Sequence, residues 1–307
     1  MGTAVRDGAI AAYFQEPTQL QPRLHFYDTH NTQLGALWEQ ALTDNIDITV
    51  GPLLKPNVEA FRKLTAQSVQ PRLLLNFTND GQTISGEYQI GIAIEEEARA
   101  IIDSLLFSGF SRLLVVESEA RWANRVLLQL QKLWPHKIAH AQFSDIRTIT
   151  QAVGQAMAVS ASQQRHTQLQ QIIGEQLEFL PRARKDVDAI VTLTNQVETQ
   201  ALIPALKFHF ADSLPVYATS QAARGAQTPQ LDGIRLTEMP MFAQPSPSQQ
   251  SLDQAFELNT HPQAELLGLG FDAAKLALHL AMHVEGQSLV IPGARTALVG
   301  PTKPGKA

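Results

Sequence analysis

The residues best suited to ligand chemistry in this 307-residue chain directly follow short apolar runs, where polar turns begin. Hydroxyl and backbone N–H groups at such turns can bind a carboxylate, and an acid such as Asp28 or Glu117 can bind an amine. Candidates of this kind are Asp28, Gly51, Pro52, Leu53, Asn76, Thr78, Ser118, Thr194, Asn195, Thr219 and Ser220. Residues of these types are also common in ordinary loops, so a purely structural role is the competing interpretation.

Two histidines, His279 and His283, are four residues apart in the last apolar segment and would share one face of a helix. A zinc peptidase needs the pattern His-Glu-x-x-His, but Leu280 follows His279, so the base is missing. No third ligand can be named. The absence of cysteine also excludes thiolate metal sites, cysteine nucleophiles and disulfides. We therefore expect no metal.

Two glycine-containing stretches imitate nucleotide-binding motifs. Gly268 to Ala273 follows the pattern GxGxxA, but no long strand precedes it, so we expect a tight helix entry near residue 271. The tail TALVGPTKPGKA has P-loop spacing, but Ala307 follows Lys306 where Ser or Thr would hold magnesium. These departures argue against an NTPase, and we expect no cofactor.

No serine lies in a GxSxG elbow, and none has an assignable base. The consecutive acids Glu95, Glu96 and Glu97 would face different directions on a helix, so they do not form a catalytic pair. We interpret all three as favourable charge at a helix N-terminus. The chain is predicted not to be an enzyme.

The elements that position the candidates follow one repeated pattern, seen in DITVGPLLKPNVEAF. The β-branched run at 48–50 predicts a strand, Gly51-Pro52 ends it, and apolar residues from Val58 then recur at helical spacing. Strands are expected at 24–27, 48–50, 72–77, 112–116, 138–143, 188–193 and 216–219, and helices at 4–14, 34–42, 94–105, 120–134, 195–208 and 271–284. The alternation predicts an α/β protein with two doubly wound parallel-sheet lobes.

Segments 86–91 and 231–236 are predicted to cross between the lobes. Lobe 1 would comprise residues 1–88 and 237–307, with a loop at 239–248, and lobe 2 residues 89–236. Because the carboxyl ends of parallel strands converge, the candidate residues are expected to surround a cleft between the lobes.

Composition narrows the class of partner. The net charge is −5 and no long basic cluster occurs, which argues against nucleic acid. No apolar run reaches the roughly 18 residues that a membrane span needs. The first residues, MGTAVRDGAIAAYF, lack the apolar core of a signal peptide and indicate a short helix.

The order of elements, with the chain returning to lobe 1 near its end, resembles a type I periplasmic-binding-protein fold. The segments AVRDGAIAAYF, DITVGPLLKPNVEAF, EYQIGIAIEEEARA, DAIVTLTN, PVYATS and LLGLGFDAAKLA resemble the carboxyl-terminal domain of the LpoA (LppC-type) lipoprotein family. The resemblance covers nearly all of residues 4–294.

That resemblance implies a non-enzymatic activator of a class A penicillin-binding protein in the Gram-negative envelope. It also implies a periplasmic location and attachment to the outer membrane through a lipid anchor and a helical-repeat domain that this sequence does not contain. The alternative is a periplasmic solute receptor that closes on an amino acid or similar small molecule, since one fold carries both functions.

Two further expectations concern the surface and the ends. The Gln-rich segment 163–178 is a candidate docking helix for the synthase. The strand-like residues 296–299 have no following element, and the chain opens directly on a helix. Either the terminal strand pairs beside residues 24–27, as in a circular permutation, or the chain is trimmed.

Overall fold

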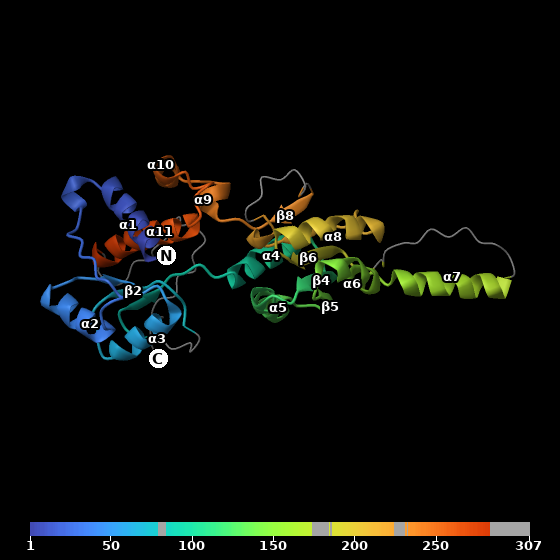
Figure 1. The fold of residues 1–307 in the computed structure, drawn as a ribbon, viewed down its shortest axis with the longest axis horizontal. Helices are drawn as coiled ribbons and strands as arrows, with labels where there is room; N and C mark the ends of the chain where they lie inside the picture. The colour runs from blue at the N-terminus through green and yellow to red at the C-terminus, as the bar shows by residue number, and fades with distance from the viewer. Residues whose placement is uncertain (79–83, 174–183, 185, 224–230, 232, 283–307) are drawn as a thin grey trace. The chain divides into compact units, whose positions relative to one another are not determined.

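The computed structural model describes residues 1–78, 84–173, 184, 186–223, 231 and 233–282 (Figure 1). The chain divides into two compact units. The first comprises Met1–Ala93 together with the chain from Met239 onward, and the second is the continuous segment Ile94–Glu238. The first unit is therefore assembled from two separate stretches of sequence and the second from one.

Among the described residues, the first unit contains a sheet of three parallel strands in the order β1-β2-β3. The strands are β1 (Thr49–Val50), β2 (Arg72–Leu74) and β3 (Glu87–Gln89). Segment 86–91, expected to cross between lobes, instead supplies β3. Because β3 pairs with β2, the first unit extends to Ala93 rather than to residue 88.

Helices cover both faces of this sheet. They are α1 (Gly2–Gln15), α2 (Leu34–Thr43), α3 (Lys55–Leu64) and α11 (Ala264–Met282). Leu74 points toward α2 and α3, where it packs with Val58 and Phe61. Leu73 and Leu75 point the other way, into a cluster formed with α1 and α11. Alternation along β2 thus places side chains in two separate apolar layers.

Helix α11 begins at Ala264, several residues before the expected start at 271, so the glycines of the GxGxxA pattern lie inside a helix and do not form its entry. Their surroundings explain them. A Cβ atom on Gly270 would lie 1.9 Å from the carbonyl oxygen of Val5, and one on Gly8 would lie 2.0 Å from that of Leu267. The glycines let the backbones of α1 and α11 approach closely.

Residues 24–27 are not a strand in the structure, which corrects the expectation from their composition. Leu24 and Phe26 are 42% and 57% exposed, so this run does not enter the core. A strand needs a partner, and the described residues place none beside it. The proposed partner at 296–299, and with it the permutation hypothesis, lies outside the described residues.

The second unit contains, within its described residues, a parallel sheet of five strands in the order β5-β4-β6-β7-β8. They are β4 (Leu113–Ser118), β5 (Ile138–Phe143), β6 (Ala189–Leu193), β7 (Val216–Ala218) and β8 (Ile234–Leu236). The strands predicted in this half of the chain are confirmed. β4 is flanked by β5 on one side and β6 on the other, so the chain reverses its direction of winding between β4 and β6.

This sheet is also covered on both faces, which makes it doubly wound (Figure 1). The helices are α4 (Glu95–Phe107) and α5 (Arg121–Leu133) on one face, and α6 (Ile149–Ala156) and α8 (Gln196–Phe208) on the other. Leu113 and Val115 point to the first pair, and Leu114 and Val116 to the second. The continuous apolar run of β4 follows from burial on both sides.

The remaining helical elements lie in the segments between those already described. They are α7 (Val159–Ile173), α9 (Pro240–Ala243), α10 (Pro247–Phe256) and the 3-10 turns η1 (Thr18–Leu20), η2 (Ile146–Thr148) and η3 (Ser220–Ala222). Segment 239–248, expected to be a loop, contains α9 and the start of α10, because Ser246 and Gln249 form a capping box. No helix in the described part of the chain is both long enough and apolar enough to cross a membrane.

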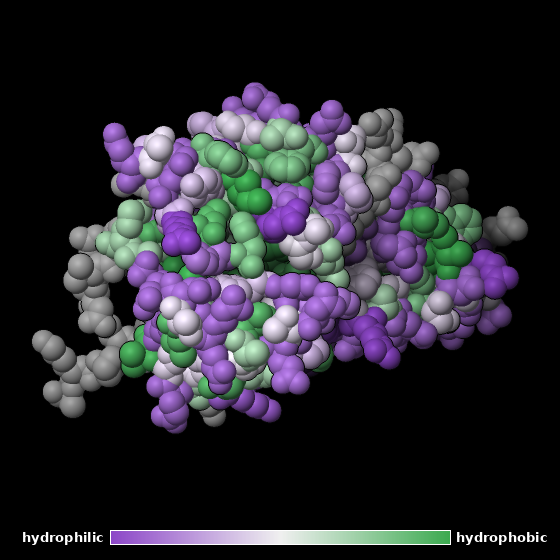
Figure 2. Space-filling view, turned by 60° about the vertical axis from the view of Figure 1, so that its left-hand side comes forward, coloured by the Kyte–Doolittle hydropathy of each residue, from purple (hydrophilic) through white to green (hydrophobic). Residues whose placement is uncertain are grey.

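On the face drawn in Figure 2, apolar side chains form small patches separated by polar ones. A shallow groove of about 400 Å³ lies between α1 and α10. Ile10, Phe14, Leu252 and Phe256 line it, with Asp7 and Gln15 at the polar positions. The groove is mostly apolar, and none of the residues that line it is a candidate site residue.

Candidate functional site

The carboxyl edge of the second sheet brings together the five candidate residues of that unit. Ser118 ends β4, Thr194 and Asn195 follow β6, and Thr219 and Ser220 follow β7. Because these strands are parallel neighbours, their ends lie side by side. Between β4 and β6, where the winding reverses, the hydroxyl of Ser118 donates to the carbonyl oxygen of Leu193 at 3.4 Å.

A buried chain of hydroxyl groups continues from this point. Oγ1 of Thr194 lies 2.6 Å from that of Thr192 and 2.7 Å from that of Thr199, and Thr199 donates to the carbonyl oxygen of Asn195. Asn195 in turn caps α8, since its side chain accepts from the N–H of Glu198 while its own N–H donates to that carboxylate. These predicted ligand groups hold the start of α8 in place.

At the ends of β7 and β8, the hydrogen-bond donors already bind a carboxylate of the protein itself, that of Glu97. The backbone N–H and the hydroxyl of Ser220 each donate to the carboxylate of Glu97 at 2.7 Å. The hydroxyl of Thr237, which follows β8, donates to the same carboxylate. Thr219 Oγ1 is buried beside them without a hydrogen-bond partner. Glu97 and Thr237 are therefore site residues that the sequence analysis missed.

Glu95, Glu96 and Glu97 all lie in the first turn of α4, as their interpretation as charge at a helix N-terminus predicts. Glu95 pairs with Arg125 at 3.1 Å, and Glu96 lies 3.6 Å from Arg99. Glu97 is buried because it lies four residues before Ile101, on the apolar stripe of α4. Its spacing from Ile101 could therefore have predicted the burial of Glu97 from the sequence.

Glu117, the alternative amine-binding acid, is also engaged. It is buried near the end of β4, and its Oε1 lies 2.9 Å from Nε2 of His140 on β5. Burial raises the pKa of Glu117, while the interaction with His140 opposes the rise. The second carboxylate oxygen, Oε2, is buried without a hydrogen-bond partner.

In the first unit, the candidates Gly51 to Leu53 and Asn76 join neighbouring strand ends. Gly51 N–H donates to Leu73, and the peptide bond between Gly51 and Pro52 is cis. The carbonyl oxygen of Pro52 accepts from Leu75 N–H at 3.1 Å, and the Asn76 amide donates to the carbonyl oxygen of Leu53 at 3.2 Å. These contacts fix the turns after β1 and β2.

Asp28 is not at a strand end, because residues 24–27 form no strand. Its carboxylate accepts from the N–H of His30 at 2.8 Å and from the amide of Asn31 at 2.7 Å. These hydrogen bonds lower the pKa of Asp28, the bond from His30 most. The residue stabilises its own turn.

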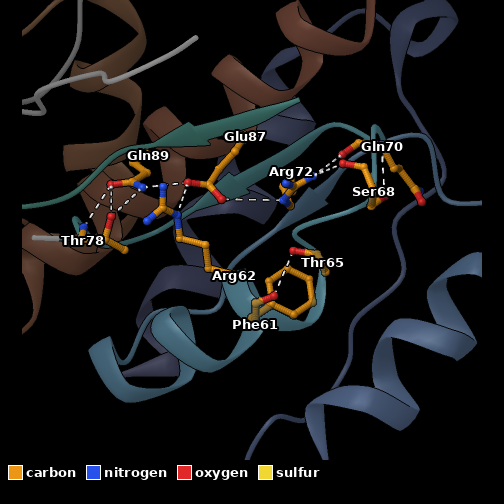
Figure 3. A network of polar contacts seen from close by, with 9 residues as sticks. All are labelled: Phe61, Arg62, Thr65, Ser68, Gln70, Arg72, Thr78, Glu87 and Gln89. Carbon is orange, nitrogen blue, oxygen red and sulfur yellow. Dashed lines mark hydrogen bonds and ion pairs between the residues drawn. The ribbon is translucent and has the colours of Figure 1, made fainter. Parts of the chain in front are cut away.

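Thr78, the last candidate of this unit, belongs to a buried polar network that sequence reasoning did not find (Figure 3). Oε1 of Gln89 accepts from Thr78 N–H at 3.0 Å, and Nε2 of Gln89 donates to Glu87 at 2.9 Å. The same oxygen of Glu87 accepts from Nε of Arg62 at 2.7 Å. The network thus connects the turn after β2 with β3 and α3.

Arg72 extends this network along β2 (Figure 3). It is fully buried, and its Nη1 donates to the carbonyl oxygens of Ser68 and Gln70 at 3.0 and 3.1 Å. Its Nε lies 3.8 Å from Oε2 of Glu87, so one carboxylate faces two guanidinium groups. Burial lowers the pKa of Arg72. The arrangement stabilises the packing of α3 against β2 and β3.

The described residues contain no cluster of three potential metal ligands. Nδ1 of His279 lies 2.8 Å from the carbonyl oxygen of Lys275 in its own helix. Its proposed companion, His283, is outside the described residues. At both sheet edges, most candidate side chains form hydrogen bonds with other groups of the chain, and the Thr219 hydroxyl is a buried exception.

The sequence is similar to one protein family over nearly its whole length. A family model described as LppC putative lipoprotein matches residues 1–298. The penicillin-binding protein activator LpoA of Vibrio cholerae serotype O1 is 26% identical over 299 residues, covering 93% of this chain and 50% of that protein. The protein of the same name from Vibrio vulnificus is 27% identical over 290 residues, covering 90% and 48%. The chain spans about half the length of these relatives.

Solved structures show the same fold. The C-domain of LpoA (YraM) from Haemophilus influenzae, described as a regulator of PBP1A, superposes with a TM-score of 0.70 at 20% identity. The superposition covers 98% of this chain and 88% of the Haemophilus influenzae domain. A putative branched-chain amino acid ABC transporter protein from Chromobacterium violaceum gives 0.69 at 22% identity, covering 95% and 86%. The two-unit α/β fold is therefore shared with an activator domain and with a transport protein.

Proposed function

The chain belongs to the LppC putative lipoprotein family, and we propose that it is a non-enzymatic regulator that binds a class A penicillin-binding protein and activates its peptide cross-linking. The observation that carries this proposal is the family match over residues 1–298, together with relatives named as activators of penicillin-binding proteins. The family's description as a lipoprotein supports a place in the cell envelope, and within the envelope we propose an association with the outer membrane.

The candidate site supports a regulator over a receptor. A solute receptor needs free donors for its ligand, whereas here the side chains of Asn76, Asn195 and Ser220 bind groups of the protein itself. Breaking the buried pair of Ser220 with Glu97 to admit a solute would leave unpaired polar groups. These pairings support our proposal that the strand ends serve the fold and that the partner binds elsewhere.

We propose α7 as the surface that docks on the synthase. Leu169, Ile172 and Ile173 are 49%, 80% and 51% exposed and lie on one face of this helix, three and four residues apart. An exposed apolar stripe of this kind is typical of an interaction surface. Segment 163–178 was expected to be such a helix, and the described helix covers it up to Ile173.

The proposal is tested with the purified domain and a class A penicillin-binding protein of its own organism. The domain is expected to bind the synthase and to raise the rate at which it cross-links peptides. The triple variant Leu169→Gln, Ile172→Gln, Ile173→Gln removes the stripe but keeps helix-forming side chains, and affinity should fall more than about tenfold.

The matched control uses the opposite face of the same helix, where Gln164 and Gln171 are exposed. Replacing both by alanine should change affinity by less than about twofold. If the wild-type domain neither binds nor stimulates a synthase, the regulator function is wrong. If both variants bind as well as the wild type, the regulator stands but α7 is not its docking surface.

A second candidate function is a solute receptor, favoured by the shared fold with the Chromobacterium violaceum transport protein. That the candidate residues surround a ligand cleft stays a prediction. Calorimetric titration of the domain with amino acids and muropeptides separates the two functions. Saturable heat from an amino acid would support the receptor, and heat from none, with binding to the synthase, supports the regulator.

A further inference from the structure

We propose that Ser220 and Thr237 form a carboxylate-binding site that the chain fills with its own Glu97. The chain enters the second unit just before Glu97 and leaves it just after Thr237. We further propose that the filled site holds these two connections next to each other within the second unit.

The site has the composition expected of a carboxylate receptor. One backbone N–H and two hydroxyls, all from the carboxyl ends of β7 and β8, converge on the two oxygens of one carboxylate. Glu97 is 4% exposed and Ser220 7% exposed, so these charge-assisted bonds are shielded from water and correspondingly strong. This is the donor set that a solute's carboxylate would need, and the protein supplies the anion itself.

The position of the site in the chain gives it a further consequence. The chain enters the second unit at Ile94 and leaves it at Glu238. Glu97 lies in the first turn of α4, just after the entry, and Thr237 directly precedes the exit. Their hydrogen bond keeps the two connections next to each other where they meet the second unit. Twisting one connection relative to the other must then strain or break it.

The first experiment removes the anion and returns it from solution. Glu97→Ala deletes a CH₂–COO⁻ group, which acetate matches in size and charge. Thermal unfolding is followed by tryptophan fluorescence in a Trp38→Phe background, where Trp122 and Trp134 of the second unit remain. Glu97→Ala should lower the Tm by roughly 4–10 °C, and acetate should restore roughly 2–4 °C of it beyond its effect on the parent.

Two controls isolate the site. Glu96→Ala changes the same charge one position earlier, where the carboxylate forms only a partly exposed pair with Arg99, and should shift the Tm by less than about 2 °C. Acetamide and chloride should not rescue Glu97→Ala, since neither is a carboxylate. If Glu97→Ala is too unstable to purify, Thr237→Val removes one donor and should lower the Tm by a smaller amount.

The binding-site part of the proposal is overturned if Glu97→Ala or Thr237→Val behaves like Glu96→Ala. It is also overturned if acetate helps Glu97→Ala no more than chloride does.

The second experiment tests the fastening. The chain contains no cysteine, so Glu59→Cys and Asn124→Cys place one spin label on an exposed position of each unit. Thr237→Val should broaden the distance distribution between the labels at temperatures well below its Tm, and Glu97→Ala should broaden it further. Acetate should narrow the distribution of Glu97→Ala only. Distributions that match the parent in both variants would show that the site stabilises the second unit without restraining its connections.

Discussion

Gly8 of α1 and Gly270 of α11 each lie against the backbone of the opposite helix, where neither has room for a methyl group. The two residues are far apart in sequence, yet they set the spacing of the helix pair that covers one face of the first sheet. A side chain at either position would push the helices apart and open the cluster around Leu73, Leu269 and Leu276.

Gly8→Ala and Gly270→Ala should therefore each destabilise the first unit by about 1–3 kcal/mol or more. Gly35→Ala in α2 is the matched control, because a Cβ there meets nothing within 4 Å. Its expected effect is a small stabilisation, since alanine favours a helix more than glycine. Urea unfolding followed by circular dichroism measures all three. A loss no larger for Gly8→Ala than for Gly35→Ala would contradict the close approach.

Removing the carboxylate of the first unit's network should be severe. Glu87→Gln leaves Arg62 and Arg72 buried without a compensating anion, and such a change typically costs about 3–5 kcal/mol. Asp7→Asn breaks the exposed pair with Arg6 and should cost less than about 1 kcal/mol. Denaturant midpoints of the two variants give the comparison. Similar midpoints would mean that Glu87 does not neutralise the buried arginines.

The Glu117–His140 pair predicts a pH dependence with a definite sign. Because burial raises the pKa of Glu117 above its ordinary value of 4.5, the native state binds this proton more tightly than the unfolded state. Its contribution to stability is fully present below about pH 4.5 and declines as pH rises through the raised pKa. His140 opposes the rise, so His140→Gln should move the decline to higher pH and deepen it.

Urea unfolding of the wild type, His140→Gln and Glu117→Gln at a series of pH values measures this effect. Glu117→Gln should show a flatter profile above about pH 4.5, because the titrating group is gone. Superimposable profiles for wild type and His140→Gln would show that the imidazole does not act on Glu117.

Asn195→Ala distinguishes a structural cap from a ligand contact. The variant loses the bond to Glu198 N–H and should lower the free energy of unfolding by about 1 kcal/mol. Stimulation of the synthase should be unchanged at a temperature where the variant is folded. Asn195→Asp keeps an acceptor at the cap and should retain most of the stability. Full stability in Asn195→Ala together with lost activity would assign Asn195 to function.

The strands of the second unit were predictable because their signal is local. Segment 188–193 is an apolar run bounded by polar residues, as expected of a strand inside the sheet. Segment 138–143 has polar residues at alternate positions, as expected of a strand at the edge of the sheet. Segment 24–27 has a similar composition but forms no strand. A strand also depends on a partner elsewhere in the chain, which no local pattern reveals.

Among the polar contacts, too, some could be predicted from local spacing and others depend on the fold. Glu97 could have been placed from its spacing to Ile101, since that position lies on the buried stripe of α4. The pairing of Arg62 with Glu87 joins residues 25 positions apart and depends on where α3 and β3 meet. The sequence marks both residues as charged near apolar runs, but only the fold shows that they neutralise each other.

The continuity of the second unit and the discontinuity of the first imply an order of folding. Residues 94–238 contain every described strand and helix of the second unit, so this unit can fold without the rest of the chain. The first unit must wait for α11, because α1 packs against a helix that begins at Ala264. Until α11 is in place, α1 exposes its apolar face, and a chaperone that binds unfolded chains would find its target there.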